Sequence, residues 1–297
     1  MSVDLRPLTT ADLAASKIVL AAACEFDRAD VVAEEKLLGP APAGPTQAWA
    51  AWRDGALVGV ASACADRLRL LAVTPAARWR GVGSALLGAV EAAARARGPV
   101  RLRTLDQAGN YLAPGIDARN TSALSWLGRR GYTSLTQRNT NLLIDVRTNP
   151  RVSPARAAEL AAEAARRGYL VRRADRTERP LLAAIGREFG GAWPWEIERA
   201  LGCEPAAVHV AIDPGGDYAA FAAHDGNNRG LGWFGPAGTW PAHRGRGLGE
   251  AVLMACLVDV AAHHATCEVA WIGPRPFYAK AAGIADERSF VVMSKLL

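Results

Sequence analysis

The sequence predicts an α+β fold made of two successive copies of one domain. The pattern R-x-R-G-x-G occurs twice, at residues 78–83 and 244–249. Each copy follows an apolar run and precedes an Ala/Leu/Val-rich segment of helical character. The spacing repeats as well, with 75 residues from Val3 to the first copy and 74 from Leu170 to the second. Coincidence would have to reproduce both motif and offset, so a duplicated domain follows.

In the first half, the elements are expected in the order strand, helix, strands, helix, strand. Thr9 or Thr10 is placed to cap the first helix, and Arg53-Asp54-Gly55 is a hairpin signal between two strands. A strand is expected to end where the glycine motif begins. The strands are predicted at residues 3–8, 47–52, 56–63 and 67–73, and the helix after the motif at 84–97.

The second half repeats this order. Pro214-Gly215-Gly216 separates two strands as a hairpin signal. The strands are predicted at residues 169–173, 208–212, 218–223 and 233–239, and the helix after the motif at 250–263. Between the halves, Ser153 and Pro154 begin an Ala-, Glu- and Arg-rich helix with the composition of a solvated linker. We therefore expect domains at residues 1–148 and 169–297, joined by a linker at 149–168.

The composition predicts a soluble, cytoplasmic protein. The chain has 297 residues, of which 50% are hydrophobic, enough for a buried core. No apolar run reaches the length of a membrane span, and the N-terminus lacks the apolar core of a signal peptide. The five cysteines show no C-x-x-C spacing, which favours small core residues over disulfides, and no metal site is expected.

The net charge of +6 raises the alternative of a nucleic-acid-binding module. Most of the basic residues are arginines, and they are dispersed among acidic residues instead of forming a basic run. Together with abundant Ala and Gly, this pattern is typical of proteins encoded by GC-rich genes. We therefore expect no nucleic-acid partner and no membrane partner.

The glycine motifs predict an anion site. A glycine-rich turn between strand and helix directs backbone N–H groups toward a phosphate, and neighbouring arginines pair with its oxygens. An ordinary tight turn is the alternative for one copy, but two copies at one offset favour a selected site. Leu86 and Val252 stand where a dinucleotide fingerprint needs its third glycine, and the Gly-Lys-Ser/Thr of a Walker loop is absent.

The motif resembles the pyrophosphate loop of the GNAT acetyltransferases, [Q/R]-x-x-G-x-[G/A] at the start of a helix. A later family element, N-x-x-A-x-x-[LF]-Y-x-x-x-G-[FY], is similar to residues 120–132 and 273–284. The resemblance covers almost the whole chain as two tandem GNAT domains, each a twisted mixed β-sheet flanked by helices. It implies acetyl transfer from acetyl-CoA to a primary amine, as in bacterial glucosamine/glucosaminide acetyltransferases and, more distantly, mycothiol synthase.

The resemblance also implies roles for individual residues. Tyr278 stands at the family's tyrosine position, although one extra residue separates it from the following glycine, and would protonate the departing thiolate. The first half has Leu127 there, so catalysis is expected in the second half, with a degenerate first half that can still bind acetyl-CoA. The expected acetyl-CoA contacts are Leu71, Ala72, Val73, Arg78, Trp79, Arg80, Gly81, Val82, Gly83 and Ser84 in the first half, and Ala237, Gly238, Thr239, Arg244, Gly245, Arg246, Gly247, Leu248, Gly249 and Glu250 in the second.

The acceptor is less well defined by the sequence. Asp117 ends a Gly- and Pro-rich segment, and Trp193 and Glu196 lie where acetyltransferases often bind their acceptors, so these three are the acceptor candidates. A surface connection and helix-start packing are the alternatives. The partner expected is a small-molecule amine, an amino sugar first. A peptide, protein or polyamine acceptor and a non-catalytic acetyl-CoA sensor stay open, as does the oligomeric state.

Overall fold

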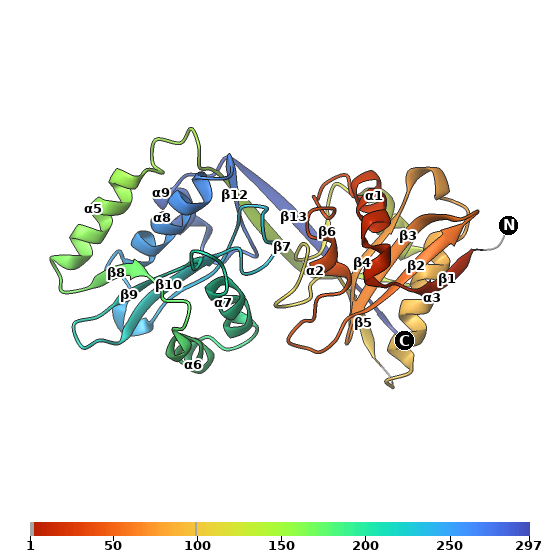
Figure 1. Cartoon of the computed structure of the whole chain (residues 1–297), viewed down its shortest axis with the longest axis horizontal. Helices are drawn as coiled ribbons and strands as arrows, with labels where there is room; N and C mark the ends of the chain where they lie inside the picture. The colour runs from red at the N-terminus through yellow and green to blue at the C-terminus, as the bar shows by residue number, and fades with distance from the viewer. Residues whose placement is uncertain (1–2, 99) are drawn as a thin grey trace. The chain divides into compact units, whose positions relative to one another are not determined.

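The computed structural model describes residues 3–98 and 100–297 and divides the chain into two compact units. Unit 1 comprises Met1–Asn139 together with Ser289–Leu297, and unit 2 comprises Thr140–Arg288. Each unit contains parallel and antiparallel strand pairs with helices packed against them (Figure 1). The predicted fold class, an α+β arrangement of two mixed-sheet units, is confirmed.

In unit 1 the strand order is β1-β2-β3-β4-β5-β13, and the short β6 pairs with β13. The first four strands are antiparallel neighbours, β4 and β5 are parallel, and β5 and β13 are antiparallel. The strands are β1 (Asp4–Pro7), β2 (Gln47–Arg53), β3 (Ala56–Cys64), β4 (Arg67–Val73), β5 (Arg101–Thr104), β6 (Ile116–Asp117) and β13 (Asp286–Leu296).

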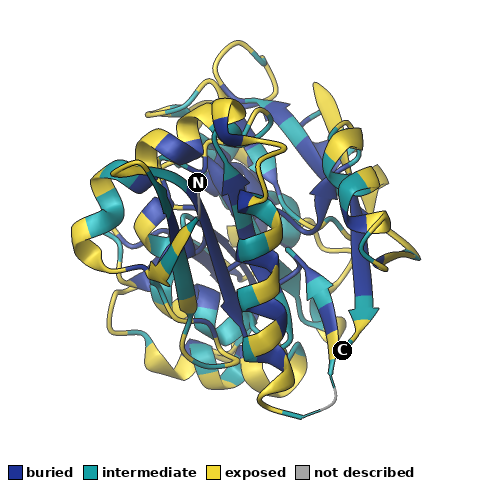
Figure 2. Cartoon of the chain, turned by 90° about the vertical axis from the view of Figure 1, so that its right-hand side faces the viewer, coloured by how far each residue is buried: buried dark blue, intermediate teal, exposed yellow. Residues whose placement is uncertain are grey.

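The helices of unit 1 cover both faces of its sheet, because alternate residues of a strand point to opposite faces. Gly59 of β3 faces one helix closely, since a Cβ on it would lie 3.0 Å from the side chains of Val82 and Leu86. Ser62 points to the other face, where its hydroxyl donates to the Lys36 carbonyl at 2.8 Å. Figure 2 shows buried strands beneath helices with exposed outer surfaces. The helices are α1 (Leu13–Ala23), α2 (Ala33–Leu37), α3 (Val82–Arg95) and α4 (Thr121–Gly128).

Unit 2 repeats the plan with strand order β8-β9-β10-β11-β12-β7. One core packs α5, α8 and α9 against the sheet, and a second core packs α6 and α7 against β9 and β10. The strands are β7 (Thr133–Asp145), β8 (Leu170–Arg173), β9 (Val208–Ile212), β10 (Tyr218–His224), β11 (Trp233–Thr239) and β12 (Thr266–Val269), and the helices are α5 (Pro154–Ala165), α6 (Arg179–Glu188), α7 (Trp193–Leu201), α8 (Leu248–Ala261) and α9 (Arg275–Ala281).

The two units exchange their last strands. The first half ends in β7, but residues 142–145 of β7 pair antiparallel with β12 in unit 2. The second half ends in β13, but residues 294–296 pair with β5 in unit 1. The division therefore differs from the predicted domains at 1–148 and 169–297, because backbone pairing places residues 140–148 in unit 2 and 289–297 in unit 1.

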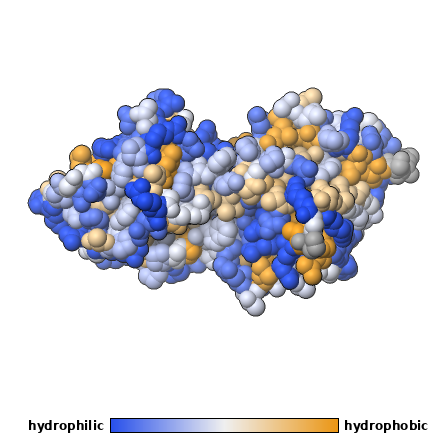
Figure 3. All heavy atoms as spheres, turned by 90° about the horizontal axis from the view of Figure 1, so that it is seen from below, coloured by the Kyte–Doolittle hydropathy of each residue, from blue (hydrophilic) through white to orange (hydrophobic). Residues whose placement is uncertain are grey.

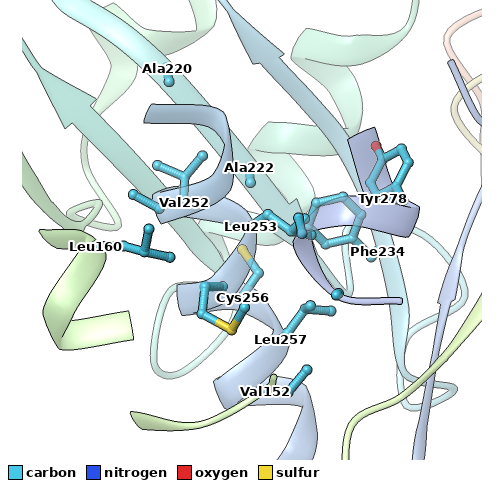
Figure 4. Packing of buried hydrophobic residues seen from close by; sticks show 14 of the residues in the cluster. Val152, Leu160, Ala220, Ala222, Phe234, Val252, Leu253, Cys256, Leu257 and Tyr278 are labelled. Carbon is cyan, nitrogen blue, oxygen red and sulfur yellow. The ribbon is translucent and has the colours of Figure 1, made fainter. Parts of the chain in front are cut away.

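Helix α5 is present at the predicted place, but it is not a solvated linker. The Ser153 hydroxyl caps it by accepting from the Arg156 N–H at 3.1 Å. Leu160 and Ala164 are buried in the core beneath α8, where Figure 4 shows Leu160 beside Val252. An amphipathic stripe of small and apolar residues explains the difference, because alanines pack closely while the Glu and Arg side chains face outward. The segment 149–168 thus belongs structurally to unit 2.

The surface of the chain mixes polar and apolar residues. On the face seen in Figure 3, hydrophobic residues are scattered among hydrophilic ones. Within residues 3–98 and 100–297, no helix combines the length and apolar character needed to cross a bilayer. All five cysteines are free thiols, and Cys64, Cys256 and Cys267 are buried.

A charged cluster ties the C-terminal part of α8 to the sheet of unit 2. The Asp259 carboxylate lies 2.7 Å from His209 Nε2, 3.3 Å from His224 Nε2 and 2.7 Å from Arg173 Nη2. Burial opposes ionisation of Asp259, but these three donors outweigh it and hold the pKa of the carboxyl far below its ordinary value. Burial likewise opposes the charge on His224, yet hydrogen bonds to Asp225 and Asp259 raise its pKa.

The substitution Asp259→Asn is expected to lower the free energy of unfolding of unit 2 by about 2–4 kcal/mol, since it removes the charge that faces the buried His209 and His224 and the half-buried Arg173. The raised pKa of His224 contributes stability below about pH 6.5 that is lost as the pH rises through the folded-state value. Thermal unfolding monitored by circular dichroism at pH 6 and pH 9 checks both points. The melting temperature of the wild type should exceed that of Asp259→Asn by more at pH 6 than at pH 9. The substitution of an exposed residue, Asp217→Asn, serves as the control. Equal melting temperatures would exclude this role of Asp259.

Candidate functional site

The two glycine motifs form loops with the same backbone path. Each begins with one 3-10 turn, Pro75–Ala77 in unit 1 and Pro241–His243 in unit 2. The next residues have nearly identical dihedral angles, with φ −63° and ψ 156° at Arg78 and φ −64° and ψ 155° at Arg244. The arginine side chains also agree, because Arg78 Nε donates to the Val73 carbonyl at 3.3 Å and Arg244 Nε to the Thr239 carbonyl at 3.2 Å.

Two positions in each loop are left-handed. Gly81 and Gly247 precede the helices with φ of 83° and 72°. Two residues earlier, Trp79 has φ 63° and Gly245 has φ 75°. A Cβ on Gly81 or Gly245 would meet nothing within 4 Å, so the φ angle and not crowding favours glycine. Trp79 adopts this conformation without glycine's freedom, and its side chain is exposed.

Each loop presents an uncapped helix N-terminus to solvent. No side chain hydrogen-bonds to the first amides of α3 or α8 as a cap, and Gly81 and Gly247 are exposed. The positive end of the helix and its free N–H groups favour an anion here. Four exposed arginines surround the two N-termini, and none forms an ion pair with a carboxylate of the residues described. These arginines are Arg78, Arg80, Arg244 and Arg246.

The strand before each loop separates from its parallel neighbour. In unit 1, β4 and β5 pair only at Arg67↔Arg103 and Leu68↔Thr104. In unit 2, β11 and β12 pair only at Trp233↔Glu268 and Phe234↔Val269. Among the described residues, the remaining positions of β4 and β11 have no strand partner on that side. Each unit therefore has an open strand edge that leads to its loop.

The alternation of an antiparallel ladder identifies which backbone groups face the open edge. The Thr74 N–H donates to Val58 and the Trp240 N–H to Ala219, so these residues form hydrogen-bonded pairs. The residues one position earlier, Val73 and Thr239, direct their backbone N–H and C=O groups to the opposite side, away from β3 and β10. The groups on the open edge thus belong to Leu71 and Val73 in unit 1 and to Ala237 and Thr239 in unit 2, whereas those of Ala72 and Gly238 pair with β3 and β10.

The helix beside each loop sets the correspondence between the halves. A Cβ on Gly83 would lie 3.2 Å from the Trp126 ring on α4, and a Cβ on Gly249 would lie 3.7 Å from the Phe277 ring on α9. Trp126 and Phe277 therefore occupy equivalent places. The next residues, Leu127 and Tyr278, then correspond, which agrees with the sequence comparison.

Tyr278 is buried between two aromatic rings. Its ring centroid lies 5.0 Å from that of Phe277 and 6.3 Å from that of Phe234, both in edge-to-face geometry. Figure 4 shows Tyr278 close to Phe234 at the margin of the unit 2 core. Burial raises the pKa of Tyr278 to about 12, with a smaller contribution from Cys267. The phenol is therefore protonated at neutral pH and can donate its proton. Leu127 is a buried core residue.

The first helical turn differs between the two loops. In unit 1, the Ser84 hydroxyl accepts from Arg130 Nη2 at 2.8 Å, and Arg130 stacks on Trp126. In unit 2, the corresponding Glu250 places a carboxylate next to the helix N-terminus. Arg156 of α5 neutralises it with an ion pair of 2.9 Å. Neither Arg130 nor Arg156 was expected at a loop from the sequence, because each comes from a segment far away in the chain.

Each of the three acceptor candidates is packed within its own unit. Asp117 lies in unit 1, is buried, and forms a bidentate ion pair with Arg119 at 2.9 and 2.7 Å. Trp193 stacks on Phe189 at a centroid distance of 5.2 Å within the α6–α7 core. Glu196 is buried on α7. Trp193 and Glu196 thus belong to a different core of unit 2 from Tyr278, so helix-start packing describes Trp193 better than sugar stacking does.

A tight contact explains Gly238. A Cβ at this position would lie 2.9 Å from the rings of Phe189 and Phe221, so the aromatic core of α6 and α7 rests directly on β11. Among residues 3–98 and 100–297, no group of three or more His, Cys, Asp or Glu side chains is arranged to hold a metal ion.

Comparisons with known proteins agree with this geometry. Residues 44–133 match the family model of the GNAT acetyltransferase domain, a range that contains the first loop and α4. No curated protein sequence shows a significant match.

Solved structures with the same fold cover both units. A GCN5-related N-acetyltransferase from Sphaerobacter thermophilus aligns over 99% of this chain and 95% of its own, with TM-score 0.69 and 18% identity. A tandem GNAT protein from the clavulanic acid biosynthesis pathway aligns over 99% and 98%, with TM-score 0.73 and 17% identity. A fungal glucosamine N-acetyltransferase region aligns over 99% of this chain at TM-score 0.75 and 17% identity, and this chain spans 38% of that multi-domain protein.

The structural alignments establish the fold, and the family model adds sequence evidence for residues 44–133 of the first unit. Both units show the same strand order, the same loop conformation and the same open strand edge. Both units of the chain therefore carry the GNAT fold, and residues 44–133 match the GNAT acetyltransferase domain in sequence.

Proposed function

We propose that the protein transfers an acetyl group from acetyl-CoA to a primary amine by direct attack on the thioester, and that unit 2 carries the reaction. One observation carries this assignment of roles. On equivalent helices beside equivalent loops, unit 2 has the protonated phenol of Tyr278 and unit 1 has the aliphatic Leu127. Only the first of these can donate a proton to a leaving group.

The chemistry needs few groups from the protein. The amides of the loop and Arg244 and Arg246 would hold the pyrophosphate of the donor, and the open edge of β11 would pair with its pantetheine arm. A backbone N–H at Ala237 or Thr239 would polarise the thioester carbonyl as negative charge develops on its oxygen. The neutral amine attacks the carbonyl carbon, the C–S bond breaks, and the Tyr278 hydroxyl gives its proton to the departing sulfur. The amine's own proton leaves to water.

Both loops are proposed to bind the donor, because their backbone paths and free arginines agree. Isothermal titration with acetyl-CoA is expected to give a stoichiometry of two per chain. Gly81→Val and Gly247→Val are matched variants, since each places a β-branched residue at a left-handed helix start. Each should reduce the stoichiometry to one. A wild-type value of one that only Gly247→Val abolishes would restrict binding to unit 2.

An amino sugar is the acceptor class we propose. The support is a similarity, since the fungal region that shares the tandem fold is described as a glucosamine N-acetyltransferase. The segments at residues 111–117 and 232–236 also resemble those of the bacterial glucosaminide enzymes. Within the chain, Asp117, Trp193 and Glu196 have structural partners or buried positions, so the acceptor contacts are expected to come from other residues.

A screen of acceptor amines that measures free CoA tests the proposal. Glucosamine and related amino sugars are expected to release CoA above the rate of hydrolysis, and mass spectrometry of the product should show one added acetyl group. Turnover with peptides or polyamines but not with amino sugars would contradict the proposed acceptor class, while the proposed acetyl-transfer reaction would stand. Tight binding of acetyl-CoA without turnover of any amine would favour a sensor and contradict the enzymatic proposal.

A further inference from the structure

Helix α5 lies outside the repeated plan of the two units. It precedes β8, the first strand of the unit 2 series, and has no counterpart among the described residues of unit 1. Its buried stripe, which includes Leu160 and Ala164, packs in the same core as α8. This packing places α5 alongside the helix whose N-terminus forms the second glycine loop.

Three side chains from the α5 segment, meaning here α5 and the residues that follow it up to Tyr169, lie next to the loop of unit 2 or its first helical turn. Arg156 Nη2 lies 2.9 Å from the Glu250 carboxylate. The Tyr169 hydroxyl lies 3.1 Å from Nδ1 of His243 in the 3-10 turn before the loop. Arg167 Nη2 lies 3.7 Å from the place that a Cβ on Gly247 would occupy. The α5 segment therefore flanks the loop from its beginning to the start of α8.

Arg167 has the position and charge of a phosphate ligand. Its Nε donates to the Glu163 carbonyl at 3.1 Å, a contact that directs the guanidinium along the end of α5. No carboxylate in the described part of the chain pairs with it, although most arginines with printed contacts in unit 2 have an acidic partner. At the equivalent Gly81 of unit 1, a Cβ would meet nothing within 4 Å. A guanidinium next to the glycine that precedes the helix is thus found in unit 2 and not in unit 1.

The second loop has an excess of positive charge that a bound anion would balance. The uncapped N-terminus of α8 carries positive partial charge, and Arg167 adds a full charge next to Gly247. Glu250 is the acidic group in the first turn, and its charge is already neutralised by Arg156. A phosphate oxygen between the helix start and the guanidinium would accept charge-assisted hydrogen bonds from both.

We propose that Arg167 binds a phosphate group of the acyl donor in unit 2, so that α5 forms part of the donor site. This inference rests on the proposed acetyl-CoA-dependent function. Arg156 acts as a positioning residue, because it removes the repulsion that Glu250 would otherwise exert on the same phosphate. In unit 1 the additional guanidinium is that of Arg130, which contacts Ser84 in the first helical turn and does not lie beside Gly81.

Titration calorimetry with CoA tests the role of Arg167. A Gly81→Val background restricts the measurement to unit 2. There, Arg167→Ala is expected to raise the Kd for CoA about ten-fold, since one charge-assisted hydrogen bond to a phosphate is lost. Arg167→Lys should recover part of the affinity. The neighbouring and exposed Arg166→Ala removes the same charge and should change the Kd less than two-fold. Unchanged melting temperatures for all three variants would show that the fold is intact.

Titration with 3′-dephospho-CoA identifies the phosphate. An equal effect of Arg167→Ala on both ligands assigns the contact to the pyrophosphate, and an effect on CoA alone assigns it to the 3′-phosphate. A Kd for CoA that Arg167→Ala leaves unchanged, or that Arg166→Ala raises equally, overturns the proposal. Failure of the wild-type chain to bind CoA at all would instead contradict the proposed function, on which the role of Arg167 depends.

Discussion

Tyr278→Phe is expected to lower kcat for acetyl transfer by about 100-fold, the lower range for loss of a general acid. The substitution removes one hydroxyl and leaves the ring between Phe234 and Phe277, so packing is kept. The KM for acetyl-CoA should change little, because the hydroxyl acts on the departing sulfur and not on the bound phosphates. Steady-state measurement of free CoA with an active amine checks this split between kcat and KM.

The pH dependence gives a second readout. Burial raises the pKa of Tyr278 to about 12, so the phenol keeps its proton throughout the range in which amines become deprotonated. The rate of the wild type is therefore expected to rise with pH as the acceptor amine loses its proton, without a decline near pH 10. Ionisation of Tyr278 would lower the rate only above that range.

Tyr132→Phe is the matched control for this substitution. Tyr132 is a buried tyrosine of unit 1 whose hydroxyl donates to Glu91 at 3.1 Å. Its loss should reduce stability by about 1 kcal/mol, a typical value for one hydrogen bond, and leave kcat unchanged. A normal kcat in Tyr278→Phe with acetyl-CoA still bound would remove Tyr278 from the mechanism. A loss of kcat in both variants would point to a general effect on the fold.

A chain that ends at Arg288 is expected to lose the folded state of unit 1. The deletion removes the part of β13 that pairs with β5 and β6. It also removes Val291 and Met293 from the unit 1 core. Burial of two such side chains contributes about 3–6 kcal/mol, and the broken ladder adds to this loss. The total is comparable with the stability of a whole domain, about 5–15 kcal/mol. Hydrogen exchange of the β2–β4 amides would report the unfolding.

Two further chains sharpen this test. Removal of Leu296 and Leu297 alone keeps the pairing of Ser294 with Arg103 and should leave unit 1 folded. Separate expression of residues 1–148 and 149–297 should give two unstable products, because each lacks the last strand of its own sheet. Their coexpression should restore a soluble complex. A stable, folded product from residues 1–148 alone would show that the strand exchange is not required.

The individual strands and helices could be predicted from the sequence because each depends on a pattern of neighbouring residues. The strands at residues 67–73, 208–212 and 233–239 were predicted with the bounds that the structure shows. Apolar runs bounded by Gly and Pro are sufficient to mark such strands. The correspondence of Leu127 with Tyr278 was likewise accessible, because both lie at a fixed distance from a recognisable motif in an unbroken segment.

Residues of the site that come from distant segments of the chain could not be predicted from the sequence. Arg167 follows a helix whose composition indicated solvent, and only the packing of that helix on α8 brings it to Gly247. Trp193 and Glu196 were expected near an acceptor, but the Trp193 ring packs in a helix–sheet core and Glu196 is buried on α7. A single sequence does not show which face of a helix will pack against a sheet.

The sequence by itself determined the duplication, the order of the elements and the position of both glycine loops, since these depend on patterns within about twenty residues. Only the tertiary structure decided the assignment of the last strands. Residues 140–145 and 289–296 have similar apolar patterns, and a strand can complete the edge of either sheet through the same backbone hydrogen bonds. Which edge it completes is set by the path of the chain and the packing of both units, and neither is encoded locally.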